Sequence, residues 1–400
     1  FMVENLSINK AYQYLLIILA FLMPLTVFGA NLIIVTICLL WLFSGNYKSK
    51  FDQIISNKLM LASIVFFFLH VVGLLWTEDL SWGLHIVHKM WYFLLLLPVL
   101  FTIVRREHIK FYITAFLLAI TFTEIASYLV WFEIIKPFKN ATVANPTPFM
   151  SHVSYNPILA FATYLVLHQI FFNKEIKNFI FSICVFFAIS MSVNMFITGG
   201  RAGQVVFFVM MAILVFQVLD KQRIKSLITI FILLPSIFFS AYYASPLFQK
   251  RVNLAISEVQ TYSDHTETSV GLRINFAINS WQMIKENPLI GVGTGDFPDE
   301  YAKINQINSP SLPNIENPHN MYTLVLSQLG LIGIISMLSI FYLQIQLSFN
   351  SKDKFIRDVG IVLPMMFLVM MLSDSYILGH YTTLMFIFFS SFLYKDFEKS

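Results

Sequence analysis

Long apolar runs separated by short polar segments dominate this chain. A helix that crosses a bilayer needs about 20 mostly apolar residues, so the sequence predicts about 12 transmembrane helices, of which the second and fourth are short. The runs centre near Leu19, Val35, Phe67, Leu96, Phe122, Tyr164, Phe186, Met210, Phe231, Leu331, Phe367 and Phe388. We therefore expect an all-α polytopic membrane protein.

The composition agrees with this fold class. Hydrophobic residues make up 57% and charged residues 12% of the 400 residues, whereas soluble domains carry about 25% charged residues. Cys38 and Cys184 both lie inside apolar runs, which indicates neither a disulfide nor a metal site. Because no basic and aromatic patch is evident, we expect membrane lipids and no nucleic acid among the partners.

The positions of Lys and Arg predict the orientation. Most of the 26 basic residues fall on one side if the N-terminus is cytoplasmic, and the short loops opposite hold only Lys89, Lys136, Lys139 and Arg201. We expect a bacterial inner membrane protein with both termini in the cytoplasm. Residues 1–244 then carry helices 1–9, residues 245–318 form a periplasmic loop, and residues 319–400 carry helices 10–12 of one integrated membrane domain.

The long loop contains one segment with helical periodicity, Ser269–Glu286. Apolar residues recur at helical spacing on one face, and the other face is polar, which predicts an amphipathic helix in the membrane interface. The apolar face comprises Ile274, Ala277, Ile278, Trp281 and Ile284, and the polar face comprises Arg273, Asn279, Gln282 and Lys285. The run Gly291-x-Gly293-x-Gly295 follows Asn287-Pro288. It is either a tight turn or a phosphate-binding loop, although it lacks the strand and Lys of a nucleotide loop.

His319 is the sharpest candidate for catalysis. It follows Asn317-Pro318, a pair typical of an N-cap and a first helical residue, which predicts that His319 lies in the first turn of the tenth helix. The helix dipole there disfavours an imidazolium, so the ring could accept a proton as a general base. The alternative is an interfacial histidine that satisfies nearby backbone, but the arginines of the outer face favour catalysis.

Arg201 and Arg273 are candidate anion ligands. Arg201 lies in Thr198-Gly199-Gly200-Arg201-Ala202-Gly203, where a helix N-terminus and a guanidinium could together bind phosphate. Arg273 lies at the start of the interfacial helix and could bind the same anion as Arg201. The alternatives are a snorkelling arginine at Arg201 and a solvated helix face at Arg273.

Other polar residues on the outer face are weaker candidates. Lys89 could contact phosphate, and His85 and His88 have the spacing of a metal pair but no third ligand, so we expect no metal site. Lys136 and Lys139 are expected to meet lipid headgroups.

Four further residues could assist binding or catalysis. His152 and Tyr155, which precede the sixth helix, could bind an acceptor, and Asn320 is adjacent to His319. Asp374 could orient a base or pair with an arginine, or it could cap a helix end. No Asp-x-Asp occurs in the first outer loop, where a metal-dependent lipid-sugar transferase would place its acids, and no Ser-His-Asp spacing is evident.

These motifs resemble the O-antigen ligase and O-antigen polymerase superfamily of bacterial inner-membrane glycosyltransferases. The resemblance rests on Thr-Gly-Gly-Arg201-Ala-Gly, Arg273, the stretch Asn-Pro-Leu-Ile-Gly-Val-Gly-Thr-Gly (287–295), and Pro-His319-Asn320 followed by Gln328-Leu-Gly-Leu-Ile-Gly. It covers the C-terminal half of the chain. In the N-terminal half, only the pattern of apolar runs and the number of helices that it predicts are consistent with the family.

The resemblance implies a metal-independent, inverting transfer that uses no cofactor. The donor would be a glycan on undecaprenyl (polyprenyl) diphosphate, held by arginines at positions like Arg201 and Arg273. A histidine at a position like His319 would activate the acceptor hydroxyl. The family's common acid near position 328 is Gln328 here, so no catalytic role is given to it.

The acceptor distinguishes members of the superfamily. Transfer to lipid A–core would make this hexosyltransferase-type enzyme an O-antigen ligase, which we favour; the alternatives are an O-antigen polymerase and a protein O-oligosaccharyltransferase. The absence of a soluble domain after the last helix disfavours the larger protein-glycosylating members. A polytopic transporter or flippase is the alternative from another class, but the sequence shows no paired halves.

Overall fold

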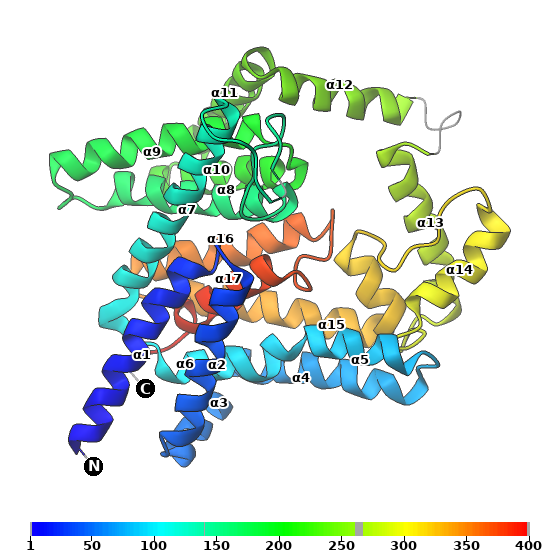
Figure 1. Ribbon diagram of the computed structural model, residues 1–400, viewed down its shortest axis with the longest axis horizontal. Coiled ribbons are helices and arrows are strands. Elements are labelled where there is room, and N and C mark those ends of the chain that lie inside the picture. Colours follow the sequence, from blue (N-terminus) through cyan, green and yellow to red (C-terminus); the bar gives the residue numbers. More distant parts are fainter. Residues whose placement is uncertain (1, 140, 261–266, 398–400) are drawn as a thin grey trace. The chain divides into compact units, whose positions relative to one another are not determined.

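Helices form the regular structure of this chain. The computed structural model describes residues 2–139, 141–260 and 267–397 (Figure 1). Within these ranges the extended pairing is limited to one isolated bridge between Thr142 and Asn145. The prediction of an all-α polytopic membrane protein is therefore confirmed.

The helices form two compact units, and each is described by itself. Unit 1 comprises residues 1–9, 38–106 and 254–400, and unit 2 comprises residues 10–37 and 107–253. Three helices contribute to both units: α1 (Met2–Leu22), α2 (Val27–Phe43) and α12 (Pro246–Gln260).

Unit 1 contains the candidate base and most of the long loop. Its helix α15 packs against α4, α13 and α16, and α17 packs against α6. Its α-helices are α3 (Tyr47–Ser56), α4 (Lys58–Val72), α5 (Leu80–Lys89), α6 (Leu97–Ile103), α13 (Ser269–Glu286), α14 (Phe297–Asn308), α15 (Met321–Phe349), α16 (Lys354–Met370) and α17 (His380–Leu393). A 3-10 turn η1 (Gly73–Trp76) follows α4, and a π-helical turn η2 (Tyr92–Leu96) precedes α6. The 3-10 turn η3 (Arg106–His108) lies at the boundary with unit 2.

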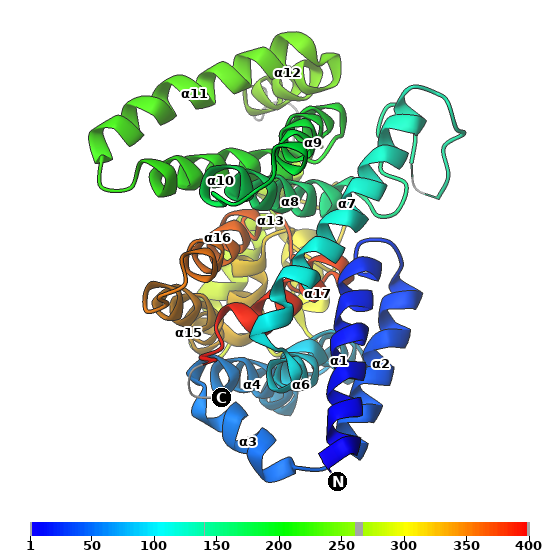
Figure 2. The same ribbon diagram turned by 90° about the vertical axis from the view of Figure 1, so that its left-hand side faces the viewer.

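Unit 2 contains the other candidate arginine. Its helices are α7 (Ile109–Trp131), α8 (His152–Phe172), α9 (Asn178–Ile197), α10 (Arg201–Leu219) and α11 (Arg223–Ala244). Helix α8 packs against both α9 and α10, and α11 packs against α10 (Figure 2). This packing places the α9–α10 turn, which contains Arg201, against the beginning of α8.

Among the described residues, seven helices are long and apolar enough to cross a membrane, or eight if α2 and α3, bent by 116°, form one span. Each of the twelve predicted centres lies within a helix, and the number twelve stays a prediction. The fourth span is not short, because Leu80–Ile103 is helical over 24 residues through the π-helical turn.

The long loop is largely helical. Its helix α13 has the predicted bounds, Ser269–Glu286, and α12 and α14 flank it in sequence. The predicted division of faces is wrong at Asn279, which is buried and donates hydrogen bonds to Tyr301 and Asn305 of α14. Ile278 and Trp281 are exposed, as expected for residues that face lipid.

A break in helix α15 determines where the long loop attaches. Gly330 has φ 60° and ψ −155°, which interrupts the helical hydrogen bonds inside an apolar span. The backbone of residues 288–293 replaces them. Leu331 donates from its amide to the carbonyl of Pro288 at 2.9 Å, and Val292 donates to the carbonyl of Ser327 at 2.9 Å. Unpaired backbone groups are costly in a bilayer, so this pairing holds the loop on the helix.

Substitution of Gly330 should therefore destabilise the fold strongly. A Cβ atom there would lie 2.3 Å from the carbonyl carbon of Leu289. Gly45 is a matched control, because its φ is +65° and nothing lies within 4 Å of its Cβ position. Gly45→Ala should cost roughly 1–2 kcal/mol from backbone strain alone, and Gly330→Ala should cost clearly more. Thermal unfolding in detergent measures both, and equal shifts would show that the loop is not docked at the break.

Candidate active site

His319 lies just before helix α15 rather than in its first turn. Its φ of +52° is in the left-handed region, which is uncommon for residues other than glycine. The N-cap is Asn320, whose side-chain oxygen accepts from the amide of Thr323 at 3.0 Å. Asn317 accepts from the amide of His319 at 2.9 Å and so forms a turn instead of the predicted cap. The prediction of a first-turn position was wrong because Asn320 takes the capping role.

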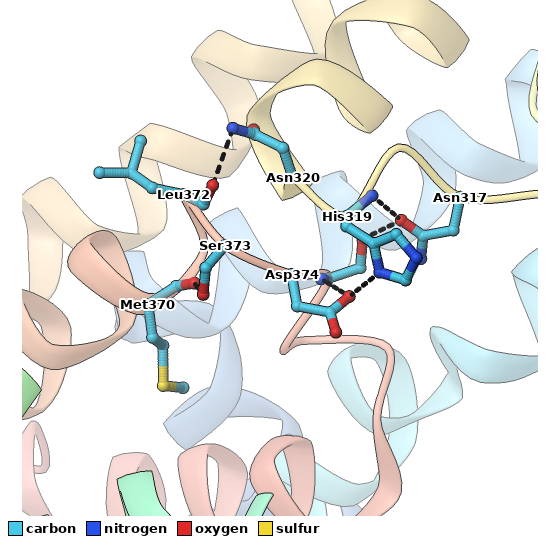
Figure 3. A network of polar contacts seen from close by, with 8 residues as sticks. Asn317, His319, Asn320, Met370, Leu372, Ser373 and Asp374 are labelled. Carbon is cyan, nitrogen blue, oxygen red and sulfur yellow. Dashed lines mark hydrogen bonds and ion pairs between the residues drawn. The ribbon is translucent and has the colours of Figure 1, made fainter. Parts of the chain in front are cut away.

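The turn that carries His319 is held by the segment between α16 and α17 (Figure 3). Asn320 donates to the carbonyl of Leu372 at 3.1 Å, and the amide of Met321 donates to the carbonyl of Met371 at 2.9 Å. On the other side of His319, the hydroxyl of Ser375 donates to Asn317 at 3.0 Å. These bonds fix the unusual backbone of His319 from both sides.

The side chain of His319 is paired with Asp374. Its Nδ1 lies 3.3 Å from Oδ1 of Asp374, and the side chains are 46% and 27% exposed (Figure 3). A carboxylate beside Nδ1 favours the tautomer with the proton on that nitrogen, which leaves the lone pair of Nε2 able to accept a proton. A base oriented by a third group is the arrangement that activates a hydroxyl.

Arg273 belongs to the same cluster. Burial acts to raise the pKa of Asp374, but the hydrogen bond from His319, the amide of Ser375 and the positive charge of Arg273 together lower that pKa below its ordinary value. Arg273 itself is exposed in α13, and one turn further along α13 the ring of Phe276 lies 6.3 Å from the ring of His319. Unit 1 therefore brings together an accessible arginine, a histidine and the carboxylate that orients it.

In unit 2, asparagine side chains hold the turn that carries Arg201. The side-chain oxygen of Asn145 accepts from the amide of Gly199 at 2.9 Å, and Asn156 donates to the carbonyl of Gly200 at 3.3 Å. Gly200 is required for close packing, because a Cβ atom there would lie 2.5 Å from the carbonyl oxygen of His152. Arg201 is half-buried as the first residue of α10, where backbone amides favour an anion.

A second arginine, Arg251 of α12, lies beside this turn. Its guanidinium is 3.5 Å from the position that a Cβ atom of Gly199 would take. His152, the first residue of α8, contacts Asn145 through Nδ1 at 2.7 Å and so lies at the same turn. No motif or periodicity in the sequence marks Arg251, and only its approach to Gly199 in the folded chain shows its place.

The other candidates stay outside these two clusters. Tyr155 is 1% exposed and donates to Asn194 at 2.8 Å, which gives it a packing role. Lys89 ends α5 and is half-buried, and no contact joins it to His319 in the part of the chain that is described. The rings of His85 and Trp82 are tilted against each other with their centroids 4.9 Å apart, and no group of three metal-binding side chains occurs among the described residues.

The Gly291–Gly295 run is a tight turn. The amide of Gly293 donates to the carbonyl of Gln328 at 3.0 Å, and the amide of Gly295 donates to the hydroxyl of Thr77 at 3.3 Å. Because protein acceptors already occupy these amides, they are not available to bind phosphate. Gln328 is buried and donates to the carbonyl of Thr294 at 2.7 Å, so its role is to hold this turn.

Residues 186–338 match the protein family described as O-Antigen ligase. This match contains Arg201, Arg273 and His319 and supports the O-antigen ligase superfamily, whose members transfer glycans. Asp374 lies beyond the matched residues. A search of curated proteins found no match to this chain.

The ionised carboxylate of Asp374 should stabilise the fold at neutral pH. Because its pKa is lowered in the folded protein, this contribution should be present above about pH 4 and lost as the pH falls further. Asp374→Asn should therefore lower the midpoint of thermal unfolding at pH 7, and the difference from wild type should shrink below about pH 4. Asp52→Asn, at an exposed aspartate, is the control. A difference independent of pH would contradict the ion pair.

Proposed function

We propose that this chain, whose residues 186–338 match the O-antigen ligase family, transfers a glycan from polyprenyl diphosphate to lipid A–core. The pairing of His319 with Asp374 is the observation that carries this proposal. A histidine oriented by a carboxylate and half-exposed to solvent is suited to deprotonate a hydroxyl group.

In the proposed reaction, Nε2 of His319 removes the proton of the acceptor hydroxyl. The oxygen attacks the anomeric carbon of the donor sugar as the bond from that carbon to the diphosphate breaks, and the leaving diphosphate takes the electron pair. Attack from the side opposite the diphosphate inverts the anomeric configuration. Asp374 holds the ring during proton transfer and stabilises the imidazolium that forms.

The leaving group gains negative charge in the transition state. We propose that Arg273 and Arg201 stabilise this charge as diphosphate ligands, because guanidinium groups match phosphate oxygens in geometry and charge. The support for Arg273 is its electrostatic effect on Asp374, and the support for Arg201 is its position at the amino end of α10. Two arginines would take the place that a divalent cation has in metal-dependent transferases.

We place this reaction on the periplasmic face of the bacterial inner membrane. The support is the asymmetric distribution of Lys and Arg, which predicts that the turns carrying Arg201, Arg273 and His319 share the outer side. The donor would be undecaprenyl diphosphate, since no nucleotide sugar is available there.

Loss of the base should abolish most of the activity. In liposomes that contain undecaprenyl-diphosphate glycan, lipid A–core and EDTA, His319→Ala should reduce the transfer rate about 10²–10⁴-fold, the range expected for a general base. His88→Ala, at another exposed histidine, should leave the rate unchanged. Undiminished transfer by His319→Ala would contradict the assignment of His319 as the base.

The same liposomes test the acceptor and the metal. Glycan attached to lipid A–core supports a ligase, whereas lengthening glycan on the polyprenyl carrier would indicate a polymerase, and glycan attached to protein Ser or Thr would indicate an O-oligosaccharyltransferase. Transfer abolished by EDTA and restored by a divalent cation would contradict the role proposed for the arginines.

Removal of either arginine should slow the chemical step. Arg273→Ala and Arg201→Ala should each reduce kcat by about 10²-fold, as for the loss of one group that stabilises transition-state charge. Arg273→Lys should recover only part of the rate, because lysine keeps the positive charge but lacks the paired N–H groups with which a guanidinium binds two phosphate oxygens. Arg223→Ala, at an exposed arginine that begins α11, is the matched control. Single-turnover rates equal to wild type would exclude these roles.

A further inference from the structure

Helix α9 of unit 2 carries polar side chains along one face of an apolar span. Ser190, Asn194 and Thr198 follow one another at intervals of four residues, and we call them the polar stripe of α9. Such groups need partners inside a membrane, because no water is available there. Thr198 lies three residues before Arg201, so the polar stripe ends at the turn between α9 and α10.

The first partner of the polar stripe is an acid, Glu124 of α7. The hydroxyl of Ser190 donates to Oε1 of Glu124, which is 1% exposed. Glu124 lies inside the candidate membrane span Arg106–Trp131. Acidic side chains at such positions are rare, and they usually serve a function. The reaction proposed above gives Glu124 no role, so its presence there requires a separate explanation.

The surroundings of Glu124 suit a neutral carboxyl group better than a carboxylate. Its Oε2 is buried and has no hydrogen-bond partner in the described part of the chain. Its Oε1 accepts from Ser190, and no ion pair joins Glu124 to a basic residue within that part. A buried carboxylate with so little compensation would be very costly. We therefore expect Glu124 to hold its proton and to bind Ser190 as a neutral group.

The middle of the polar stripe is bonded to two other helices. The side-chain amide of Asn194 donates to the hydroxyl of Ser127 at 3.0 Å, one turn along α7 from Glu124. The side-chain oxygen of Asn194 accepts from the hydroxyl of Tyr155 of α8 at 2.8 Å. Helix α7 therefore holds α9 at two successive turns, and these bonds fix the position of α9 along its own axis.

The last residue of the polar stripe holds the turn that carries Arg201. The hydroxyl of Thr198 donates to the side-chain oxygen of Asn156 at 2.8 Å, and Asn156 donates to the carbonyl of Gly200 at 3.3 Å. Gln204, in the first turn of α10, donates to the carbonyl of Thr198 at 3.1 Å. A shift of α9 along its axis would therefore move the backbone on which Arg201 lies.

We propose that Glu124 is a positioning residue for Arg201. Its neutral carboxyl group holds α9 against α7, and the polar stripe passes this position on to the turn before α10. The inference rests on the proposed function, in which Arg201 binds the leaving diphosphate. Glu124 touches no substrate and acts only through the place that it gives to α9.

Substitutions of Glu124 separate the hydrogen bond from the charge. Glu124→Ala loses the bond to Ser190 and should reduce kcat in the liposome assay about 10-fold to 10²-fold, because a small displacement of a catalytic group has an effect of that size. Glu124→Gln keeps a neutral group of the same shape, so it should recover most of the rate. A rate as low in Glu124→Gln as in Glu124→Ala would overturn the inference, because it would mean that the charge is needed.

A double-mutant cycle tests whether Glu124 acts through Arg201. In the Arg201→Ala background, Glu124→Ala should have little further effect on kcat, because the side chain that it positions is already absent. Independent effects of the two substitutions would overturn the inference. If Arg201→Ala alone transfers glycan at the wild-type rate, the proposed role of Arg201 fails instead.

Hydrogen exchange reports the turn without any measurement of activity. The amides of Gly199 and Gln204 both donate hydrogen bonds in the folded chain and should exchange slowly in wild type. Glu124→Ala should speed exchange over residues 198–204, and Glu124→Gln should not. Unchanged exchange in Glu124→Ala would overturn the inference, even if transfer is slow.

Thr163→Val is the matched control, because Thr163 is buried in α8 and its hydroxyl donates within that helix, to the carbonyl of Leu159 at 2.8 Å. It should leave both kcat and the exchange of residues 198–204 unchanged. If Glu124→Ala does not fold in detergent, Ser190→Ala removes the same hydrogen bond from the side of α9 and decides by the same two measurements.

Discussion

The break in helix α15 at Gly330 is the constraint on which the candidate active site of unit 1 depends. A helix interrupted within an apolar span leaves carbonyl and amide groups that a bilayer cannot satisfy, and the backbone of residues 288–293 satisfies them. This fixes the end of α13 against α15. Helix α13 carries Arg273, and α15 begins two residues after His319, so one backbone junction positions both residues that act on Asp374.

Asparagine side chains hold, in both units, the turn that carries a candidate site residue. An asparagine amide donates and accepts at once, so it can bind the backbone of a turn on one side and a distant segment on the other. Asn320 does this before α15. Asn156 of α8 reaches the turn before α10 with both ends of its amide, donating to the carbonyl of Gly200 and accepting from the hydroxyl of Thr198. In each unit the turn is fixed by contacts with another part of the chain, so the candidate side chain that it carries starts from a fixed backbone position. Such preorganisation is what a site for a developing anionic charge requires.

Local sequence patterns predicted the elements better than the roles of single residues in them. The bounds of α13 followed from its periodicity and from Asn287-Pro288, which end it. The assignment of Asn317 as the cap of α15 failed because two asparagines compete for that role, and the segment between α16 and α17 decides between them. The periodicity of α13 predicts that Asn279 is on the polar surface, but the packing of α14 buries it.

The sequence by itself determined the class of protein, the helices and a set of candidate residues for the site, because apolar length, periodicity and the chemistry of Gly, Pro, Asn and His act over a few residues. Only the tertiary structure decided that Asp374 orients His319, that Arg251 lies beside Gly199, and that the glycine run holds a broken helix instead of a phosphate. These pairings join positions about 35 to 55 residues apart, and at such separations periodicity carries no information, because helix packing selects the partners.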